Sequence, residues 1–592
     1  MTSPTPTFQA RERNPVVYQH ALNCGLSPLT AHIVACRVNG EVNLPAIITP
    51  HPQYLSPPNL LKHSERAAQR IVEAIVQHQS IGILTDYDVD GVTSHAIIFR
   101  ALTRYFKVPA SQIAHFIGHR LKDGYGVSAA LTQRILDLPQ KPALIITADC
   151  GSSDEYYIAQ LKQAGIEVIV TDHHAIPAEG IPASAYAVIN PTQDDCPYPD
   201  ATIAGCMTAW LLMAQVRQHL IQQQHLPATT PKLSALLSFV ALGTVADCVS
   251  MASSANNRTV VQMGLQLINQ FQEPCWIAIR ELLNELKQPA SLFTVQTLGF
   301  QLAPRINARS RMADPDAALR YLLADDTATA RHYLNQLETD NKERRQVERE
   351  MVIQAKTQAQ QQLQRMSLVI HLQQGHAGVQ GIVASRLVQT FGKPALILCP
   401  HSLDEQQLTG SGRSIPGLHI RQALQYIADH HPGFFIKFGG HKGAAGFTLD
   451  KTHLPLLVQW FEQAVIAQLG QQPLKPIILT DGKLDIDLIA PATVAELETL
   501  QPYGREFDAP VFEGQFKVQQ LRAMGSPAVH LSLELQTPRN THRAVWFSAL
   551  EQESEAWPFQ VGDTIVGAYS LTLNDYRGQQ RLQLQLHHAY RK

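Results

Sequence analysis

The sequence predicts an α/β protein: a doubly wound parallel sheet, joined by a long helix to a second α/β domain, with a small OB-like β-barrel at the C-terminal end. Three observations support this. Short apolar runs alternate with helical stretches in the first half, a polar helical stretch follows, and closely spaced alternating strands end the chain. With 592 residues the chain is too long for one core. We expect five parts: an N-terminal extension (1–64), a first α/β domain (65–316), a connecting helix (317–366), a second α/β domain (367–468) and the barrel (469–592).

The parallel sheet is expected from alternating elements that begin near residue 65. A helix over residues 64–78 precedes the buried strand SIGILT, which ends at Asp86. The strand ALIIT ends at Asp149 and EVIVT ends at Asp172, and a helix follows each of the first two strands. Short β-branched runs separated by helices are typical of parallel sheets that are covered on both faces. We expect the N-terminal extension to pack on this domain.

The connecting helix is expected because residues 317–366 are polar and contain neither Gly nor Pro. Opposite charges lie four residues apart, as at Arg344 and Glu348. A self-associating coiled coil is the weaker alternative, since apolar residues do not keep a heptad spacing. Mixed α/β sequence continues to about residue 465. The expected barrel strands are KPIILTD, VHLSLELQT, RAVWFSA, TIVGAYSLTL and QRLQLQLHHA.

The composition is that of an ordinary globular protein, with 45% hydrophobic and 17% charged residues. No apolar run approaches the roughly 18 residues of a membrane span, and the N-terminus lacks the apolar stretch of a secretory signal. The eight cysteines form no CxxC pair, so we expect free thiols in the cytoplasm and no structural zinc site. The net charge of −2 gives no general signal for nucleic acid, and any such contact must come from local basic patches.

Acidic and histidine side chains gather in four segments. They are TDYDVDGVTS (Asp86, Asp88, Asp90), ITADCGSSD (Asp149), VTDHHAIP (Asp172, His173, His174) and LGTVADCVS (Asp247). Three of them follow predicted strands, at the edge where open α/β sheets bind ligands. Carboxylates gathered there would raise each other's pKa unless cations neutralise them. Oxygen ligands with one or two imidazoles suit Mn²⁺ or Mg²⁺, and two such ions can activate water for attack at phosphorus.

Each segment alone has a simpler explanation. The DxDxD run could form a Ca²⁺ loop, but the Glu at the twelfth position and the flanking helices of an EF-hand are missing. Adjacent histidines are more often incidental surface residues, and an Asp after a helix is usually a cap. Four such segments in one α/β domain are difficult to attribute to coincidence, so we favour a metal site.

In this order, the four segments resemble the motif set of the DHH phosphoesterases, and TDHH carries the family's name. The resemblance covers almost the whole chain and is closest to the RecJ-like branch, the single-strand-specific exonucleases of bacterial DNA repair. It implies a DHH metal-binding catalytic domain at 65–316 and a DHHA1 substrate-binding domain at 367–468. Further matching segments are HRLKDGYG (119–126), INPTQDDCPYP (189–199), LAPRINARSRM (302–312), SGRSIPGLHI (411–420) and FGGHKGAAGF (438–447).

The resemblance also implies a role for each residue of the catalytic centre. The metal ligands are Asp88, Asp90, Asp149, His173 and Asp247. Asp86 is a catalytic residue that either binds metal or orients a ligand. His174 lies beside the scissile phosphate, as a contact or as a proton donor to the leaving oxygen.

Substrate contacts follow from the same resemblance. Three residues hold a 5′-terminal phosphate, which sets 5′-to-3′ polarity: Arg120, Ser411 and Arg413. The forked donor of an Arg suits phosphate, and Gly412 permits close approach of the backbone. His441 and its Gly-rich loop clamp the strand, although the loop could also be a simple turn. Arg305 and Asn307 contact the DNA backbone. Tyr125 either stacks on a base or is a core or turn residue.

Taken together, the implied function is a metal-dependent 5′-to-3′ exonuclease that hydrolyses single-stranded DNA in repair and recombination, with two Mn²⁺ or Mg²⁺ ions and an activated water. Single-stranded DNA is the expected partner, with a single-strand-binding protein and a helicase as further candidates and no membrane. One alternative is a DHH phosphodiesterase for short oligonucleotides or cyclic dinucleotides, which the additional domains argue against. Another is a non-catalytic replication or repair scaffold, which the intact acidic set argues against.

The sequence leaves the preferred metal, the oligomeric state and RNA tolerance open. It also departs from the family pattern at three places. IAGCMTAW (203–210) is less Gly-rich than the stretch expected there. Ser310 stands where a Gly is usual, which could alter a local turn. LQPYGREFDAPVF (500–512) lacks the Gly-Asn-Pro of the usual C-terminal signature.

Overall fold

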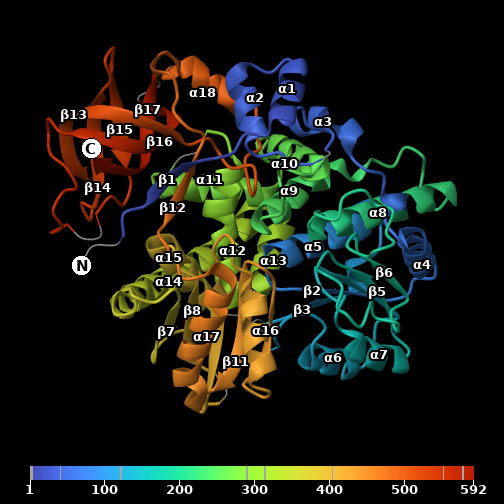
Figure 1. The fold of residues 1–592 in the computed structure, drawn as a ribbon. Coiled ribbons are helices and arrows are strands. Elements are labelled where there is room, and N and C mark those ends of the chain that lie inside the picture. Colours follow the sequence, from blue (N-terminus) through green and yellow to red (C-terminus); the bar gives the residue numbers. More distant parts are fainter. Residues whose placement is uncertain are drawn as a thin grey trace. The chain divides into compact units, whose positions relative to one another are not determined.

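The structure is a computed structural model that describes residues 4–40, 42–119, 123–288, 291–312, 315–402, 404–550, 553–576 and 579–592. The chain forms two compact units, and segments distant in the sequence contribute to each (Figure 1). One, the sheet unit, contains residues 38–344 and 502–508. The other, the barrel unit, contains residues 1–37, 345–501 and 509–592.

The sheet unit is built on five parallel strands in the order β3-β2-β4-β5-β6, as predicted for a doubly wound fold. The strands are β2 (Ile81–Thr85), β3 (Ile113–Ile117), β4 (Leu144–Ala148), β5 (Glu167–Thr171) and β6 (Ala187–Ile189). Thr85 pairs with Ala148, which pairs with Thr171, so β2, β4 and β5 end level with one another. The strand order reverses between β2 and β4, and such a switch point is where open sheets bind ligands.

Helices cover both faces of this sheet, with α6 and α7 on one side and α5, α8 and α4 on the other (Figure 1). Leu131, Ile145 and Ile158 belong to the core between the sheet and the α6–α7 layer. The helices of the unit are α3 (Leu44–Ile48), α4 (Ser64–Val76), α5 (Val89–Arg100), α6 (Ala129–Leu136), α7 (Glu155–Gln163), α8 (Gly205–Gln222), α9 (Leu237–Ala246), α10 (Ala255–Ile268), α11 (Pro274–Glu285), α12 (Ala303–Met312) and α13 (Asp316–Leu323). This packing fixes the loops that carry the four motifs.

The long helix expected over residues 317–366 is interrupted. Helix α13 ends at Leu323, and α14 (Thr327–Gln360) begins after a short break. The Asp326 carboxylate accepts a hydrogen bond from the Thr329 backbone amide (2.8 Å), which satisfies a donor at the start of the new helix. Asp326 is the one sequence signal for this break, because Asp is a common N-cap residue. The stretch contains no Gly or Pro that would mark the end of a helix.

The second sheet, in the barrel unit, confirms the mixed α/β sequence after residue 367. Its strand order is β10-β11-β9-β8-β7, with only the β7–β8 pair parallel. Helix α15 packs in one core cluster, and α16 and α17 contribute to another. The elements are β7 (Leu368–His371), α15 (Gln380–Phe391), β8 (Ala395–Pro400), β9 (Gln407–Arg413), α16 (Ile420–His430), β10 (Phe435–Gly440), β11 (Ala444–Asp450) and α17 (Leu454–Leu469).

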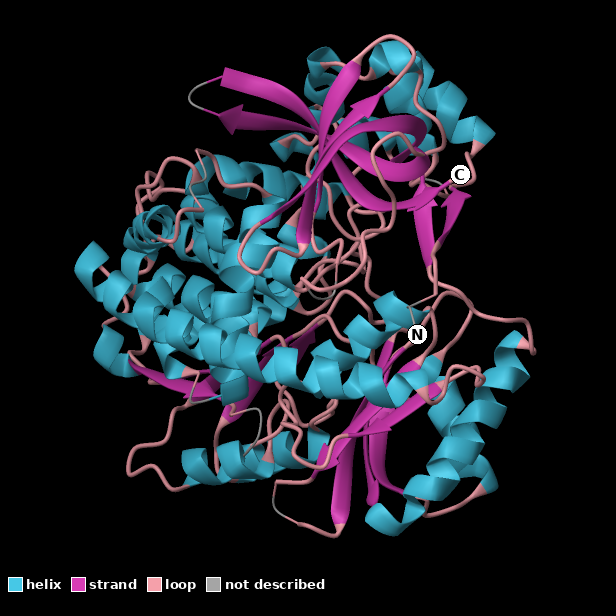
Figure 2. Ribbon diagram, turned by 90° about the vertical axis from the view of Figure 1, so that its left-hand side faces the viewer, coloured by secondary structure: helices cyan, strands magenta, loops and turns pink. Residues whose placement is uncertain are grey.

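Five strands, in antiparallel and parallel pairs, close into the predicted barrel. Its long strands wind around each other in Figure 2. The strands are β13 (Phe512–Met524), β14 (His530–Gln536), β15 (Thr541–Trp546), β16 (Thr564–Tyr576) and β17 (Gln579–Arg591). Strand β13 was not predicted from the sequence. Its buried residues Phe512, Phe516 and Val518 lie on one face, but Gly514 leaves a gap among them, and exposed polar residues follow Val518.

One predicted barrel strand lies elsewhere. KPIILTD forms β12 (Ile477–Thr480), which pairs in parallel with β1 (Thr7–Ala10) near the N-terminus. Helices α1 (Pro15–Asn23), α2 (Pro28–Ala35) and α18 (Pro491–Glu498) belong to the same unit. A buried salt bridge of 2.6 Å between Arg37 and Asp481 joins the two ends of the chain within it. Residues 1–37 therefore belong to the barrel unit, whereas residues 38–64 belong to the sheet unit.

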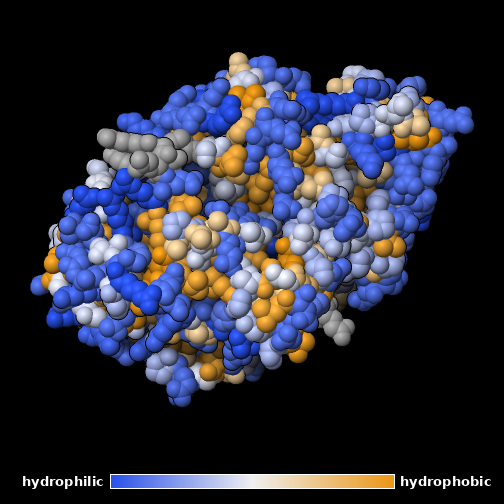
Figure 3. Space-filling model, turned by 90° about the horizontal axis from the view of Figure 1, so that it is seen from above, coloured by the Kyte–Doolittle hydropathy of each residue, from blue (hydrophilic) through white to orange (hydrophobic). Residues whose placement is uncertain are grey.

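The distribution of polar and apolar residues on the surface is that of an ordinary globular protein. Hydrophilic residues are spread over the face drawn in Figure 3, and apolar residues gather in patches among them. None of the helices in the described ranges is both long and apolar enough to cross a membrane. All eight cysteines are free thiols.

Candidate metal centre

Asp86, Asp149 and Asp172 directly follow β2, β4 and β5, and all three carboxylates are buried at the switch point of the sheet. Level strand ends bring residues that are far apart in the sequence to one edge. The placement that the sequence predicted for these acids is thus confirmed.

The remaining acids of the first motif lie at the start of α5. Asp88 is the N-cap, and its Oδ1 accepts hydrogen bonds from the amides of Asp90 (2.9 Å) and Gly91 (3.1 Å). Asp90 is buried and accepts from the amides of Gly205 (2.7 Å) and Cys206 (3.0 Å), at the positive end of α8. These backbone donors fix both carboxylates before any cation binds.

Glycines make room for this arrangement. A Cβ atom at Gly205 would lie 2.9 Å from both Asp149 Cβ and Asp90 Oδ2. A Cβ atom at Gly243, on α9, would lie 2.7 Å from Asp90 Oδ1. Only hydrogen fits at either position, so both helices can approach the acids closely.

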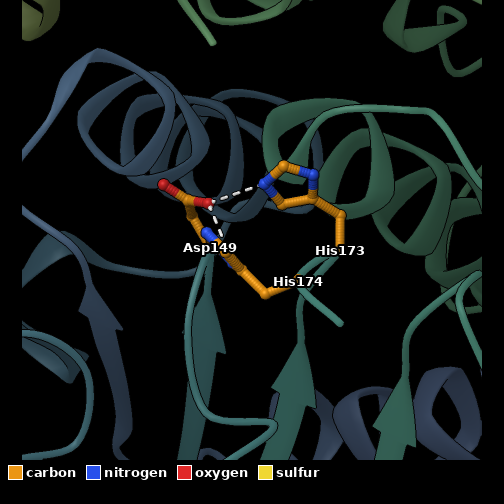
Figure 4. Close-up of side chains that lie close together, drawn as sticks. All are labelled: Asp149, His173 and His174. Carbon is orange, nitrogen blue, oxygen red and sulfur yellow. Dashed lines mark hydrogen bonds and ion pairs between the residues drawn. The ribbon is translucent and has the colours of Figure 1, made fainter. Parts of the chain in front are cut away.

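His173 stands at the centre of the acidic group. Its Nε2 lies 3.1 Å from Asp149 Oδ1, as Figure 4 shows, 3.6 Å from Asp247 Oδ2 and 3.7 Å from Asp90 Oδ2. The Asp149 backbone has φ +61°, a strained conformation for a residue with a side chain. Asp247 reaches the group from the C-terminal end of α9. One imidazole nitrogen therefore faces three carboxylates.

His174 points to the other side and is held by Asp172, a residue to which the sequence assigned no role. Nδ1 of His174 lies 2.8 Å from Asp172 Oδ1, and the His174 side chain is 45% exposed. Buried Asn190, in the INPT segment, donates to the His174 carbonyl oxygen (2.8 Å). The Tyr125 hydroxyl donates to the Asp149 carbonyl oxygen (3.2 Å) and lies 2.9 Å from His174 Nδ1, so this tyrosine belongs to the site.

Without bound cations, the buried carboxylates of the metal centre repel one another. Burial, with the charges of Asp90 and Asp88, raises the pKa of Asp247 to about 8. Burial and neighbouring carboxylates also raise the pKa of Asp149 well above its usual range. Burial lowers the pKa of His173, which favours the neutral imidazole that a metal requires. A bound cation would relieve this repulsion.

Asp172 and His174 behave differently because they pair with each other. Burial raises the pKa of Asp172, but hydrogen bonds from His174 and Ser152 outweigh it, and the pKa lies below its usual range. Burial lowers the pKa of His174, but the hydrogen bond to Asp172 and its charge outweigh that effect and raise the pKa to about 9. His174 is therefore protonated at neutral pH.

The donor set fits divalent cations. In three groups the candidate ligand atoms all lie within 4.8 Å of one another: Asp86 with Asp88 and Asp149; Asp90 with His173 and Asp247; and Asp149 with His173 and His174. Asp149 is common to two of these groups, so both would lose a candidate ligand without its carboxylate. Carboxylate oxygens with an imidazole are ligands that Mn²⁺ and Mg²⁺ accept.

Of the predicted substrate contacts in the sheet unit, Arg120 lies outside the described residues. Arg305 does not reach the surface: it is 1% exposed, and its Nε forms a 2.7 Å ion pair with Glu338. A buried, paired guanidinium cannot contact a strand, so that expectation was wrong. Asn307 is half-buried on the same helix, α12. Ser310 is also helical there and donates to the Asn307 carbonyl oxygen (3.1 Å), so it alters no turn.

In the barrel unit, Ser411 and Arg413 lie side by side on β9. Arg413 Nη1 donates to Ser411 Oγ (3.2 Å), and burial lowers the pKa of the guanidinium. Gly381, at the start of α15, faces both: a Cβ atom there would lie 2.8 Å from Arg413 Nη2. The hydrogen-bond acceptors of Arg413 are Ser411 Oγ and the Gly412 carbonyl oxygen, and among the described residues no carboxylate pairs with it. A half-buried Arg at a helix N-terminus is a suitable anion site.

His441 lies in the turn between β10 and β11, so the Gly-rich loop is a hairpin turn. The His441 amide donates to the Ala444 carbonyl oxygen (2.8 Å), and the Ser414 amide donates to Gly443 (3.0 Å). Ala444 pairs with Arg413 across β11 and β9. The turn is thus next to the Arg413 end of β9, and His441 is exposed there.

Comparison with known proteins gives family matches over most of the chain. Residues 80–244 match the DHH family, N-terminal domain; residues 366–467 match the DHHA1 domain; and residues 480–588 match the RecJ OB domain. The single-stranded-DNA-specific exonuclease RecJ of Dickeya dadantii is 33% identical over 90% of this chain and 91% of its own. The Escherichia coli protein of that name is 33% identical over 88% and 89%. The crystal structure of RecJ from Thermus thermophilus in complex with Mn²⁺ is similar with a TM-score of 0.76 and 26% identity, over 98% of this chain and 78% of that one.

Proposed function

The chain belongs to the RecJ family of DHH phosphoesterases, and from this premise we propose that it is a divalent-metal-dependent exonuclease that degrades single-stranded DNA from the 5′ end. The observation that carries the proposal is the convergence of Asp88, Asp90, Asp149, His173 and Asp247 at the switch point of the sheet. The relatives that match nearly the full length are named single-stranded-DNA-specific exonucleases.

Asp88, Asp90, Asp149, His173 and Asp247 would hold two Mn²⁺ or Mg²⁺ ions. Asp86 would complete one site or orient Asp88 beside it. Such ions would neutralise charge on the scissile phosphate and lower the pKa of a bound water. The protein's part is to hold the carboxylates in place, which the backbone donors to Asp88 and Asp90 support.

His174 is the proposed proton donor to the leaving oxygen. Asp172 occupies its Nδ1, so Nε2 is the nitrogen available to substrate. A pKa of about 9 keeps this imidazole protonated at neutral pH. Asn190 and Tyr125 would hold the His174 loop in position.

The 5′-phosphate is proposed to bind Ser411 and Arg413, with Arg120 as a further ligand. The guanidinium of Arg413 and the start of α15 both favour an anion at this place. His441 would clamp the strand from the neighbouring turn, and Asn307 would contact the DNA backbone. Capture of the terminal phosphate would give 5′-to-3′ polarity.

The proposed setting is DNA repair and recombination in the cytoplasm. A helicase that exposes single strands and a single-strand-binding protein that coats them are the proposed protein partners. A binding measurement with each purified partner tests this part separately from the enzymatic activity.

A titration of divalent metal tests the proposed activity directly. Single strands labelled at the 5′ or the 3′ end, and a blunt duplex as control, are incubated with the protein over a range of Mn²⁺ and Mg²⁺ concentrations. We expect metal-dependent release of the 5′ label before the 3′ label, and little release from the duplex. Early release of the 3′ label would contradict the polarity, and activity in excess EDTA would contradict the metal dependence.

A further inference from the structure

A short segment from the C-terminal part of the chain, residues 502–508, belongs to the sheet unit together with the metal centre. It folds as a tight hairpin in which Gly504 and Phe507 exchange backbone hydrogen bonds of 3.0 and 3.1 Å. Arg505 and Glu506 form the tip. The hairpin lies within LQPYGREFDAPVF (500–512), the segment that lacks the Gly-Asn-Pro of the usual family signature.

Buried contacts anchor the hairpin on both sides. Arg258 is fully buried, donates to the Pro502 carbonyl oxygen (2.9 Å) and lies 4.3 Å from the centre of the buried Phe507 ring. A Cβ atom at Gly504 would lie 2.7 Å from Met251 Cγ, so the backbone passes directly against Met251. The tip is therefore rigidly placed within the sheet unit.

The tip lies beside the last metal ligand. The Met251 amide donates to the Arg505 carbonyl oxygen (3.0 Å), and Arg505 Nη1 donates to the carbonyl oxygen of Cys248 (3.3 Å), the residue after Asp247.

The Arg505 side chain is accessible to solvent. The Arg505 side chain is 57% exposed, and the nearest carboxylate, on Glu506, is 3.7 Å away and itself 53% exposed. An ion pair so exposed contributes little and is easily exchanged for a better acceptor. Arg has five donors in a planar fork, and one of them is used by Cys248.

We propose that Arg505 is a phosphate-binding residue of the active site, which contacts a backbone phosphate of the DNA strand on the Asp247 side of the metal centre. The inference rests on the proposed function, because the ligand is the substrate strand. A fixed hairpin places the forked guanidinium of Arg505 against the Asp247–Cys248 turn. It partly offsets the acidic charge there, where an approaching strand would otherwise be repelled.

The test compares Arg505→Gln and Arg505→Lys with wild type and with Lys141→Gln. Lys141 is an exposed cation that precedes β4, at the end of the sheet opposite to the metal ligands, so it is a matched control for loss of one positive charge. KM and kcat on a 5′-phosphorylated single strand are measured at several salt concentrations, and thermal unfolding is recorded for each variant. A contact with one phosphate of a single strand contributes about 0.7 to the slope of log affinity against log salt.

We expect Arg505→Gln to raise KM by about five- to tenfold with little change in kcat, and to reduce the salt slope by about 0.7. Arg505→Lys should keep the slope and lose part of the affinity, because an ammonium is a point charge and cannot form the forked contact. Lys141→Gln should match wild type in both.

Equal KM and salt slope in Arg505→Gln and Lys141→Gln would overturn the inference, and a lower melting temperature alone would show that Arg505 only holds the hairpin. The proposed function fails in a distinguishable way, since wild type would then be inactive on the same strand.

Discussion

Nδ1 of His174 lies 2.8 Å from Oδ1 of Asp172, and this pair separates the two adjacent histidines of the TDHH motif into different roles. Asp172 is held in turn by backbone amides, including that of His173 (2.8 Å) and that of Ser152 (2.9 Å). His173 faces the carboxylates with Nε2, whereas His174 is directed to the exposed side.

Asp172→Asn should lower kcat by about 10- to 100-fold, because it removes the charge that orients and protonates His174. The pKa of His174, raised to about 9, should fall toward its ordinary value, so the alkaline limb of the rate profile should move to lower pH. Rates across pH measure both effects. Asp137→Asn, at an exposed carboxylate at the end of α6, is the control. An unchanged alkaline limb would remove His174 from the mechanism.

Gly205→Ala should weaken metal binding by about tenfold or more, because its Cβ would press on Asp149 and Asp90 at 2.9 Å. The same overpacking should cost about 1–3 kcal/mol in the free energy of unfolding. Mn²⁺ titration and denaturant unfolding check the two effects. At Gly446 on β11 the nearest atom to an added Cβ is 3.9 Å away, so Gly446→Ala should leave metal binding unchanged. Normal Mn²⁺ affinity in Gly205→Ala would mean that the ligands do not need this close packing.

Arg413→Ala should abolish the preference for a 5′-phosphate. We expect KM to rise by about tenfold on a 5′-phosphorylated strand and to change little on a 5′-hydroxyl strand, because one charge-assisted forked contact is lost. Steady-state kinetics on the two strands measure the difference. Arg421→Ala, at an exposed Arg on α16, controls for the lost charge. An equal loss on both strands would place Arg413 elsewhere along the DNA.

Metal-free protein should become less stable as pH rises from about 6 to about 8.5. The pKa of Asp247 is raised from 3.8 to about 8, so the folded state holds this proton more tightly than the unfolded state, and stability falls as pH rises between the two values. The pKa of His174 is raised from 6.5 to about 9, so its stabilising contribution is complete below 6.5 and is lost as pH rises through about 9.

Mn²⁺ should counter this loss, because cations bind the deprotonated carboxylates. Thermal unfolding in EDTA and in Mn²⁺ at both ends of the window measures the effect, and the shift produced by Mn²⁺ should be larger at the higher pH. A melting temperature in EDTA that increases with pH would contradict the assigned shifts.

The catalytic part of the fold could be predicted because its signals are local. The buried strands that end at Asp86, Asp149 and Asp172 are short β-branched runs. An acid that follows such a strand lies at the carboxyl edge of a parallel sheet. The position of Asp247 could also be predicted, because an apolar helix ends directly before it.

What could not be predicted depends on long-range packing. KPIILTD has the alternation of any exposed strand, and nothing in it indicates β1, some 470 residues earlier, as its partner rather than the barrel. Arg305 was expected to be a substrate contact from the family resemblance. Its partner Glu338 lies on a different helix, α14, so the ion pair that buries Arg305 could not be read from the sequence. The role of Asp172 was missed because an acid that follows a strand is equally compatible with binding a metal and with orienting a histidine.

Manganese stoichiometry tests the central claim most directly. Bound Mn²⁺ is counted by electron paramagnetic resonance during titration of wild type and of Asp149→Ala, with Asp137→Ala as the control. Because Asp149 is common to two of the ligand groups, we predict about two ions for each wild-type and control chain, and loss of at least one in Asp149→Ala. The same number of tightly bound ions in all three proteins would contradict the account.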